Sequence, residues 1–155
     1  MTAKPQPIPD GYHSVTPYLL IRGASDAIAF YIKAFGAVEV LRLAAPDGKI
    51  AHAEIRIGNS HVMMADEHPE MDFFGPQTRG GTTVSLMIYV EDVDTVFAGA
   101  IEAGGVELRP LCDQFYGDRS GTLTDPWGHL WSIATHVEDV APDEIARRFQ
   151  EFFGE

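Results

Sequence analysis

Two groups of side chains carry the residue types that acid–base or ligand-binding chemistry needs. In the first group, His52 and Glu54 are two residues apart in an alternating segment, so they share one face of a predicted strand about 7 Å apart. They are the candidate catalytic residues: a base with the group that orients it, or two ligands of a displaced metal site with His129 as a third. The alternative is a half-exposed polar face whose groups hydrogen-bond across strands.

The second group contains candidate ligand-binding residues around a predicted hairpin and the strand after it. Arg119 can hold a carboxylate or phosphate through two parallel hydrogen bonds, and the aromatic side chains offer large apolar surfaces with polar tips. Alternatively, Arg119 forms a salt bridge to Asp113 or Asp118, Trp131 fills the core and His129 caps a turn. The members of this group are Gln114, Phe115, Tyr116, Arg119, His129 and Trp131.

Composition excludes several classes of function. The chain has 155 residues and a formal net charge of −12, which argues against binding nucleic acid or anionic membranes through a general basic surface. Cys112 is the one cysteine, so no disulfide can form within the chain. No apolar run reaches the roughly 18 residues of a membrane span, and the N-terminus lacks the apolar core of a signal peptide. We therefore expect a soluble, cytoplasmic protein.

The first half of the chain has the pattern of a strand, a helix and three further strands. Ser25 is a candidate N-cap for the helix, and Gly36 is suited to end it. The predicted segments are strand 12–21, helix 26–35 and strands 38–43, 50–57 and 61–65.

The same order of elements recurs in the second half. A shift of 68 residues places Asp26 on Asp94 and Gly36 on Gly104. We interpret this as an internal duplication, with one βαβββ module over residues 12–65 and another over residues 83–136. The predicted segments of the second module are strand 84–90, helix 93–103 and strands 106–111, 120–124 and 129–135.

Three segments lie outside the modules. Residues 1–11 carry prolines at alternate positions and predict an extended arm. Residues 66–82 show no periodicity and predict a connecting loop, whose aromatic residues either cover a cavity or plug the edge of the core. Residues 137–155 predict a C-terminal helix that begins at Pro142 and packs its aromatic stripe on its own sheet or on a second subunit.

Motifs in both halves resemble those of the vicinal-oxygen-chelate superfamily, which includes glyoxalase I, bleomycin-resistance proteins and extradiol dioxygenases. Together they are similar to its PhnB-like branch. The resemblance implies an α+β fold, in which two tandem βαβββ modules form a curled mixed sheet around a cavity, followed by a C-terminal helix and often completed in a homodimer. The matching segments are 27–31, 35–37, 52–55, 57–58 and 63–67 in the first half, and 89–94, 113–119 and 125–131 in the second.

The resemblance also implies four positions that bind a divalent metal in other members. Here they fall on Thr16 and on Met63 or Met64 in the first module, and on Ser85 and Ser132 in the second. Hydroxyls and thioethers are poor ligands for a hard cation, which needs anionic oxygen or imidazole. We therefore expect no metal at the usual site, and no cofactor.

Two functions and one structural alternative follow. The chain binds a small, partly aromatic or apolar organic ligand in its cavity without the usual metal, or it is a lyase, isomerase or dioxygenase acting on vicinal oxygens. The enzyme would use His52 and Glu54 as acid and base, or a relocated divalent metal such as Zn, Ni, Mn or Fe. In the structural alternative the cavity is closed and the chain is only a homodimer. The expected partners are a small-molecule ligand and a second copy of the chain, with no nucleic acid and no membrane.

Overall fold

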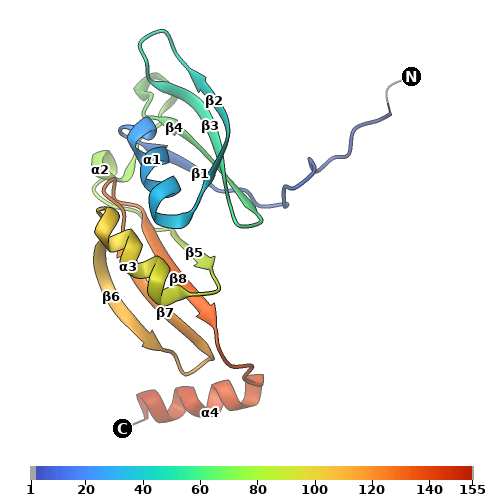
Figure 1. The fold of residues 1–155 in the computed structure, drawn as a ribbon, viewed down its shortest axis with the longest axis vertical. Coiled ribbons are helices and arrows are strands. Elements are labelled where there is room, and N and C mark those ends of the chain that lie inside the picture. The colour runs from blue at the N-terminus through green and yellow to red at the C-terminus, as the bar shows by residue number, and fades with distance from the viewer. Residues whose placement is uncertain (1–2, 155) are drawn as a thin grey trace. The chain divides into compact units, whose positions relative to one another are not determined.

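The computed structural model describes residues 3–154 and divides into two compact units, the first ending at Gly81 and the second beginning at Thr82. Each unit contains a four-stranded mixed sheet with a helix against one face (Figure 1). Both sheets have the same order, with the first strand of the unit parallel to the last. The predicted α+β class and the tandem βαβββ organisation are confirmed, and the sheets stay open.

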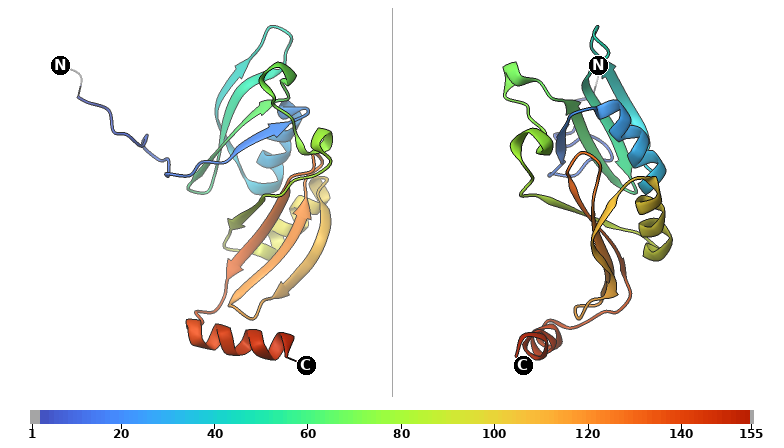
Figure 2. Two further views of the ribbon diagram at one scale, coloured as in Figure 1. Left: turned by 180° about the vertical axis from the view of Figure 1, so that it is seen from behind. Right: turned by 90° about the vertical axis from the view of Figure 1, so that its left-hand side faces the viewer.

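In the first unit the strand order is β1-β4-β3-β2. Apolar side chains of alternate residues, such as Ile55 on β3 and Met64 on β4, pack beneath α1 and are fully buried. In the left panel of Figure 2, α1 lies behind the strands, so the face that the helix leaves uncovered is in view. The elements are β1 (Tyr18–Ile21), α1 (Ala24–Phe35), β2 (Val38–Ala44), β3 (Ile50–Ile57) and β4 (Ser60–Asp66).

The start of α1 differs from the prediction. Ser25 does not cap the helix: the N-cap is Gly23, and the Asp66 carboxylate accepts the backbone N–H groups of Gly23 and Ala24, each at 2.9 Å. The same carboxylate accepts the N–H of Ile50 at 2.6 Å. A residue at the end of β4 can do this because β4 pairs with β1, which leads directly into the helix. The predicted stop at Gly36 is confirmed, with this glycine in the left-handed region at φ 66°.

In the second unit the strand order is β5-β8-β7-β6. Phe97 of α3 packs above the sheet, where Gly121 leaves room for the ring: a Cβ at this glycine would lie 2.7 Å from it. Leu123 of β7 and Ile133 of β8 are fully buried. The elements are β5 (Ser85–Tyr89), α3 (Val93–Ala103), β6 (Val106–Asp113), β7 (Asp118–Thr124), β8 (Leu130–His136) and α4 (Pro142–Phe153).

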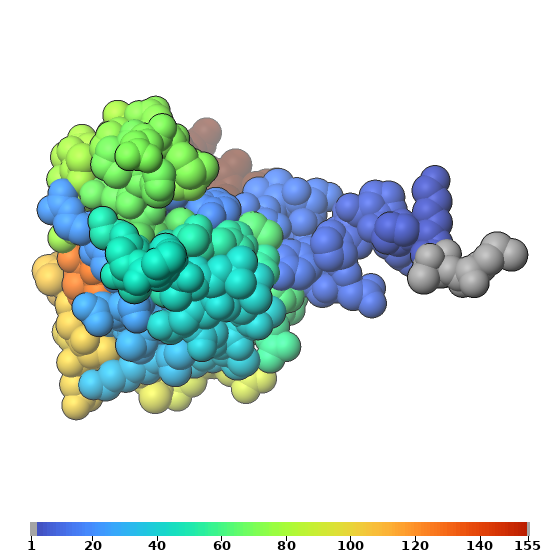
Figure 3. Space-filling view, turned by 90° about the horizontal axis from the view of Figure 1, so that it is seen from above, coloured from blue at the N-terminus to red at the C-terminus, as the bar shows by residue number. Residues whose placement is uncertain are grey.

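Two segments of the first unit differ from expectation. The predicted strand 12–21 begins only at Tyr18, because the chain first makes a turn in which Tyr12 donates its N–H to the Pro9 carbonyl. The arm before it extends from the body of the unit (Figure 3). The connecting loop, which has no periodicity in the sequence, contains two helical turns: η1 (Pro69–Met71) and α2 (Pro76–Arg79). Among residues 3–154, no helix is long and apolar enough to span a membrane.

Candidate functional site

The face of the first sheet that α1 does not cover carries His52 and Glu54 side by side. Both come from β3, whose alternate residues Ala53 and Ile55 face the helix and are fully buried. The Nε2 atom of His52 lies 3.9 Å from Oε1 of Glu54. Glu54 is only 9% exposed, whereas His52 is half-buried. The structure therefore places these two side chains next to each other on one face, as their spacing predicts.

Two tyrosines hydrogen-bond to this pair from opposite ends. The hydroxyl of Tyr18 lies 2.9 Å from Nδ1 of His52, and that of Tyr12 donates to Oε1 of Glu54 at 3.0 Å. Strand register places the tyrosine on the same face as the pair: Tyr18 and Glu54 both pair with Met63 of β4, and His52 lies two residues before Glu54 on that face. The resulting chain of polar groups runs from Tyr18 through His52 and Glu54 to Tyr12.

Aromatic rings surround the same polar groups. The ring of Phe73, from the connecting loop, has its centroid 6.3 Å from that of Tyr18. The His61 ring is stacked on Tyr12 with centroids 3.9 Å apart. Burial raises the pKa of both tyrosine hydroxyls, and the Glu54 carboxylate raises them further. Both phenols are therefore protonated near neutral pH and can donate hydrogen bonds.

Sequence reasoning missed Tyr12, Tyr18, His61 and Phe73 as members of this group. The alternation of residues in β1 could have indicated Tyr18: Leu19 and Ile21 are buried on one face of the strand, which places Tyr18 on the other face. Tyr12 lies before β1 although the sequence predicts a strand from residue 12, and Phe73 lies in the aperiodic connecting loop, so only the folded chain places these two rings.

The four positions that the resemblance implies for a metal site do not supply suitable ligands. Thr16 bonds through Oγ1 to the His13 carbonyl at 3.4 Å, and Met63 offers a thioether. In the second unit, Ser132 shares a 2.8 Å hydrogen bond with Thr122, and Ser85 begins β5. These neutral donors do not fit a hard divalent cation. Within residues 3–154 there is also no cluster of three or more His, Cys, Asp or Glu side chains placed to hold a metal ion.

In the second unit, the structure assigns Trp131 to the core. Its side chain is 1% exposed, and its indole N–H donates to the Asp125 carboxylate at 2.9 Å. His129 lies outside the strand, because β8 begins one residue later. Instead, His129 lies in the preceding turn, where its backbone N–H donates to Asp125. The structural alternative for Trp131 therefore fits its position.

The candidate ligand-binding residues near the hairpin between β6 and β7 contact different parts of the second unit. Arg119 reaches α3, where it makes two hydrogen bonds to Asp94 at 2.8 and 3.0 Å, and it also contacts Asp113. Phe115 packs against α4, with the Phe149 and Phe152 rings each 5.9 Å away. Tyr116 stands edge-on to Phe115, and Gln114 donates to the sulfur of Cys112. The six candidates therefore face the core, α3, α4 and the hairpin itself.

A second polar cluster lies on the uncovered face of the second sheet. Asp118 is 4% exposed, and its carboxylate bonds to the hydroxyl of Tyr89 and to Nδ1 of His136, both at 2.8 Å. Nε2 of His136 lies 2.8 Å from Asp139. Asp118 lies opposite His136 in the strand register and 18 residues away along the chain, whereas Asp139 is three residues away, so only strand pairing brings the three groups together.

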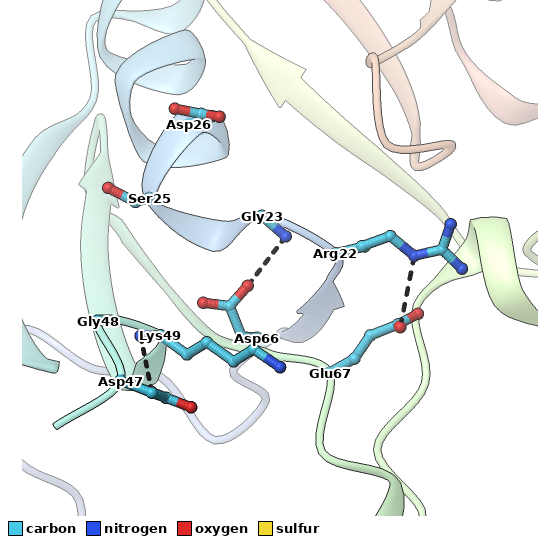
Figure 4. A pocket seen from close by; sticks show the side chains of 9 residues that line it. All are labelled: Arg22, Gly23, Ser25, Asp26, Asp47, Gly48, Lys49, Asp66 and Glu67. Carbon is cyan, nitrogen blue, oxygen red and sulfur yellow. Dashed lines mark hydrogen bonds and ion pairs between the residues drawn. The ribbon is translucent and has the colours of Figure 1, made fainter. Parts of the chain in front are cut away.

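A polar hollow of about 390 Å³ lies near the start of α1 (Figure 4). Among its carboxylates, Asp66 accepts backbone N–H groups, Glu67 pairs with Arg22, Asp47 accepts the N–H of Lys49, and Asp26 lies in the first turn of α1. Neither His52 nor Glu54 lines it. The hollow is therefore a feature of the helix cap and of the turn between β2 and β3.

Comparisons with known proteins give one consistent result. The family model described as the glyoxalase/bleomycin resistance protein/dioxygenase superfamily matches residues 13–133. The uncharacterized protein Rv0887c of Mycobacterium tuberculosis is 43% identical over 135 residues, which cover 85% of this chain and 79% of that protein.

Among solved structures, TioX from Micromonospora sp. ML1 is 26% identical, with a TM-score of 0.64 over 83% of this chain and all of TioX. A PhnB protein from Bacillus cereus is 23% identical, with a TM-score of 0.61 over 79% of this chain and 99% of that protein. At this identity the second likeness shows the fold alone.

Proposed function

Because the chain belongs to the glyoxalase/bleomycin resistance protein/dioxygenase superfamily, we propose that it binds a small, partly aromatic organic ligand without a divalent metal. The ligand site is the uncovered face of the first sheet around His52 and Glu54. One observation carries the proposal: a carboxylate, an imidazole and the rings of Tyr18 and Phe73 converge there. Small-molecule sites commonly combine apolar rings with a few fixed polar groups.

Hydrogen bonding at the site favours a ligand with donor groups. Glu54 accepts hydrogen bonds only, and the net charge of −12 repels anions. His52 has one nitrogen engaged by Tyr18 and the other directed toward Glu54. A neutral or cationic aromatic molecule is therefore the preferred class.

The test is a fragment screen against protein purified in the presence of a chelator, with its metal content measured by mass spectrometry. Aromatic fragments are detected by saturation-transfer NMR, and dissociation constants of hits are measured by calorimetry. We expect His52→Ala and Glu54→Ala to weaken binding at least about tenfold, equivalent to about 1.4 kcal/mol. His13→Ala, an exposed histidine of the arm, serves as the matched control. Binding that requires added Zn, Ni, Mn or Fe, or no binding at all, contradicts the proposal.

One geometric feature favours a second function, acid–base catalysis. Tyr18 fixes Nδ1 of His52, which leaves Nε2 facing Glu54 at 3.9 Å, the arrangement of a base and its partner. Such a pair can move the proton next to a carbonyl in an α-hydroxy ketone. We expect this activity, if present, to exchange that proton for deuterium in heavy water, with loss of exchange in His52→Ala. Binding without exchange across a panel of hydroxy ketones rejects it.

We also propose that the chain forms a homodimer through α4. Phe149, Phe152 and Phe153 are 49%, 70% and 65% exposed, whereas Arg147 and Arg148 are paired with glutamates of the same chain. A partner that offers charges therefore gains little here, but a second copy presents the same uncharged aromatic face. Sedimentation velocity tests this: wild-type protein should be dimeric and the Phe152→Ser/Phe153→Ser variant monomeric. A monomeric wild type contradicts it.

A further inference from the structure

Tyr12, at the end of the N-terminal arm, is held at a defined position on the first unit by two side chains. Its ring stacks on His61 with the planes only 17° apart, and its hydroxyl donates to Glu54 at 3.0 Å. Beside it, Nδ1 of His61 lies 3.0 Å from the Gly11 carbonyl oxygen. The flat imidazole of His61 and the carboxylate of Glu54 therefore form a binding site for one phenol: the imidazole stacks on its ring, and the carboxylate accepts from its hydroxyl.

Beyond Tyr12, the arm attaches to the sheet through the Gly11 carbonyl, which bonds to His61. Residues 3–11 are exposed, and the arm extends away from the sheet (Figure 3). Its one local turn joins Tyr12 N–H to the Pro9 carbonyl. By contrast, the two groups that receive the ring belong to paired strands: Glu54 lies on β3, and His61 lies on β4. The site formed by His61 and Glu54 is thus part of the sheet, whereas Tyr12 lies on an extended segment.

This inference rests on the proposed function. We infer that the position occupied by the Tyr12 ring is the ligand subsite, and that this subsite binds a planar aromatic ring bearing a hydroxyl or amino donor. Tyr12 occupies this subsite when no ligand is bound, and it competes with the ligand for the subsite. The donor is required because a carboxylate can only accept hydrogen bonds. The ring is required because the His61 plane offers a stacking surface. An aromatic acid without such a donor is excluded, since its carboxylate would have to face Glu54.

A purely structural Tyr12 makes a different prediction. In that case its removal exposes Glu54 to water and lowers stability, with no gain in affinity for any free phenol. An intramolecular competitor instead yields a vacant subsite when the side chain is shortened. The affinity of the same molecule for the two proteins therefore separates the roles.

The experiment titrates p-cresol and toluene into wild type and Tyr12→Ala, with dissociation constants from NMR shifts of the His61 and Tyr18 rings. We expect p-cresol to bind Tyr12→Ala at least about tenfold more tightly than wild type, and toluene to gain much less. Val15→Ala is the matched control, since Val15 lies on the same segment and is 85% exposed. In the double variant Tyr12→Ala/Glu54→Leu, the preference for p-cresol over toluene should disappear.

An unchanged p-cresol affinity in folded Tyr12→Ala overturns this inference. The proposed function then still stands if fragments from the screen bind wild type, and it fails as well if none does. Should Tyr12→Ala not fold, Tyr12→Phe replaces it: the ring remains but its hydrogen bond to Glu54 is lost, so p-cresol must again gain affinity over wild type. Equal affinity in that variant rejects the competitor role.

Discussion

Nδ1 of His136 lies 2.8 Å from a carboxylate oxygen of Asp118, a residue that is 4% exposed. The contact joins the end of β8 to the start of β7. The other carboxylate oxygen of Asp118 accepts from Tyr89, and Nε2 of His136 faces Asp139. An imidazole between two carboxylates can donate to both only when it is protonated.

His136 should make the stability of the protein depend on pH. The hydrogen bond to Asp118, followed by that to Asp139, raises the pKa of His136 in the folded state. Its stabilisation is therefore complete below the unfolded pKa of about 6.5 and is lost as pH rises through the folded value. We expect the difference in melting temperature between wild type and His136→Ala to shrink from about pH 6 to about pH 9. A difference that is constant with pH refutes the assignment.

Asp66 should matter far more than Ser25 for the stability of the first unit. Asp66→Ala removes the acceptor of three backbone N–H groups, two at the start of α1 and one at Ile50. We expect a loss of about 2–3 kcal/mol in the free energy of unfolding in urea. Ser25→Ala should change it by less than about 0.5 kcal/mol, because this exposed hydroxyl bonds to the exposed side chain of Arg42. Equal effects of the two substitutions contradict the cap that the structure shows.

Gly117 should not tolerate a side chain. It has φ 104°, and a Cβ at this position would lie 2.1 Å from the Glu138 carbonyl oxygen. Gly48 has a similar φ of 86° but open space around it, so Gly48→Ala isolates the backbone cost of about 1–2 kcal/mol. We expect Gly117→Ala to lower unfolding free energy well beyond that, since the segment leading to α4 must move. Matching urea midpoints for the two variants rule out the clash.

Arg119 should couple to Asp94 more strongly than an ordinary surface pair. The guanidinium makes two parallel bonds to this carboxylate and lowers its pKa, whereas Arg79 and Asp72 share a single contact at 3.1 Å. Double-mutant cycles with alanine should therefore give a larger coupling energy for Arg119 and Asp94, decreasing with salt. Arg119→Lys should lose most of the coupling energy, because an ammonium group cannot make two parallel hydrogen bonds to the Asp94 carboxylate. Equal coupling in both pairs disproves a special role for this contact.

Much of the fold could be read from local patterns. The alternation in Ile50–Ile57 placed His52 and Glu54 on one face, and the structure gives β3 these same bounds. Gly36 and Pro142 mark the end of α1 and the start of α4, as their conformational preferences predict. These features depend on the backbone of a few neighbouring residues, which is information that a sequence contains directly.

Contacts between distant residues were decided by the folded chain. The cap of α1 comes from Asp66, more than 40 residues away, because β4 pairs with β1. Trp131 lies in the core although its neighbours suggested a pocket, since one residue of register decides which face of a strand a side chain occupies. Tyr12 reaches Glu54 from a segment that lies outside β1, although the sequence predicts a strand from residue 12. Residue spacing therefore determined the elements and their repeat, whereas strand pairing and register determined which side chains meet, because those depend on partners that are remote in sequence.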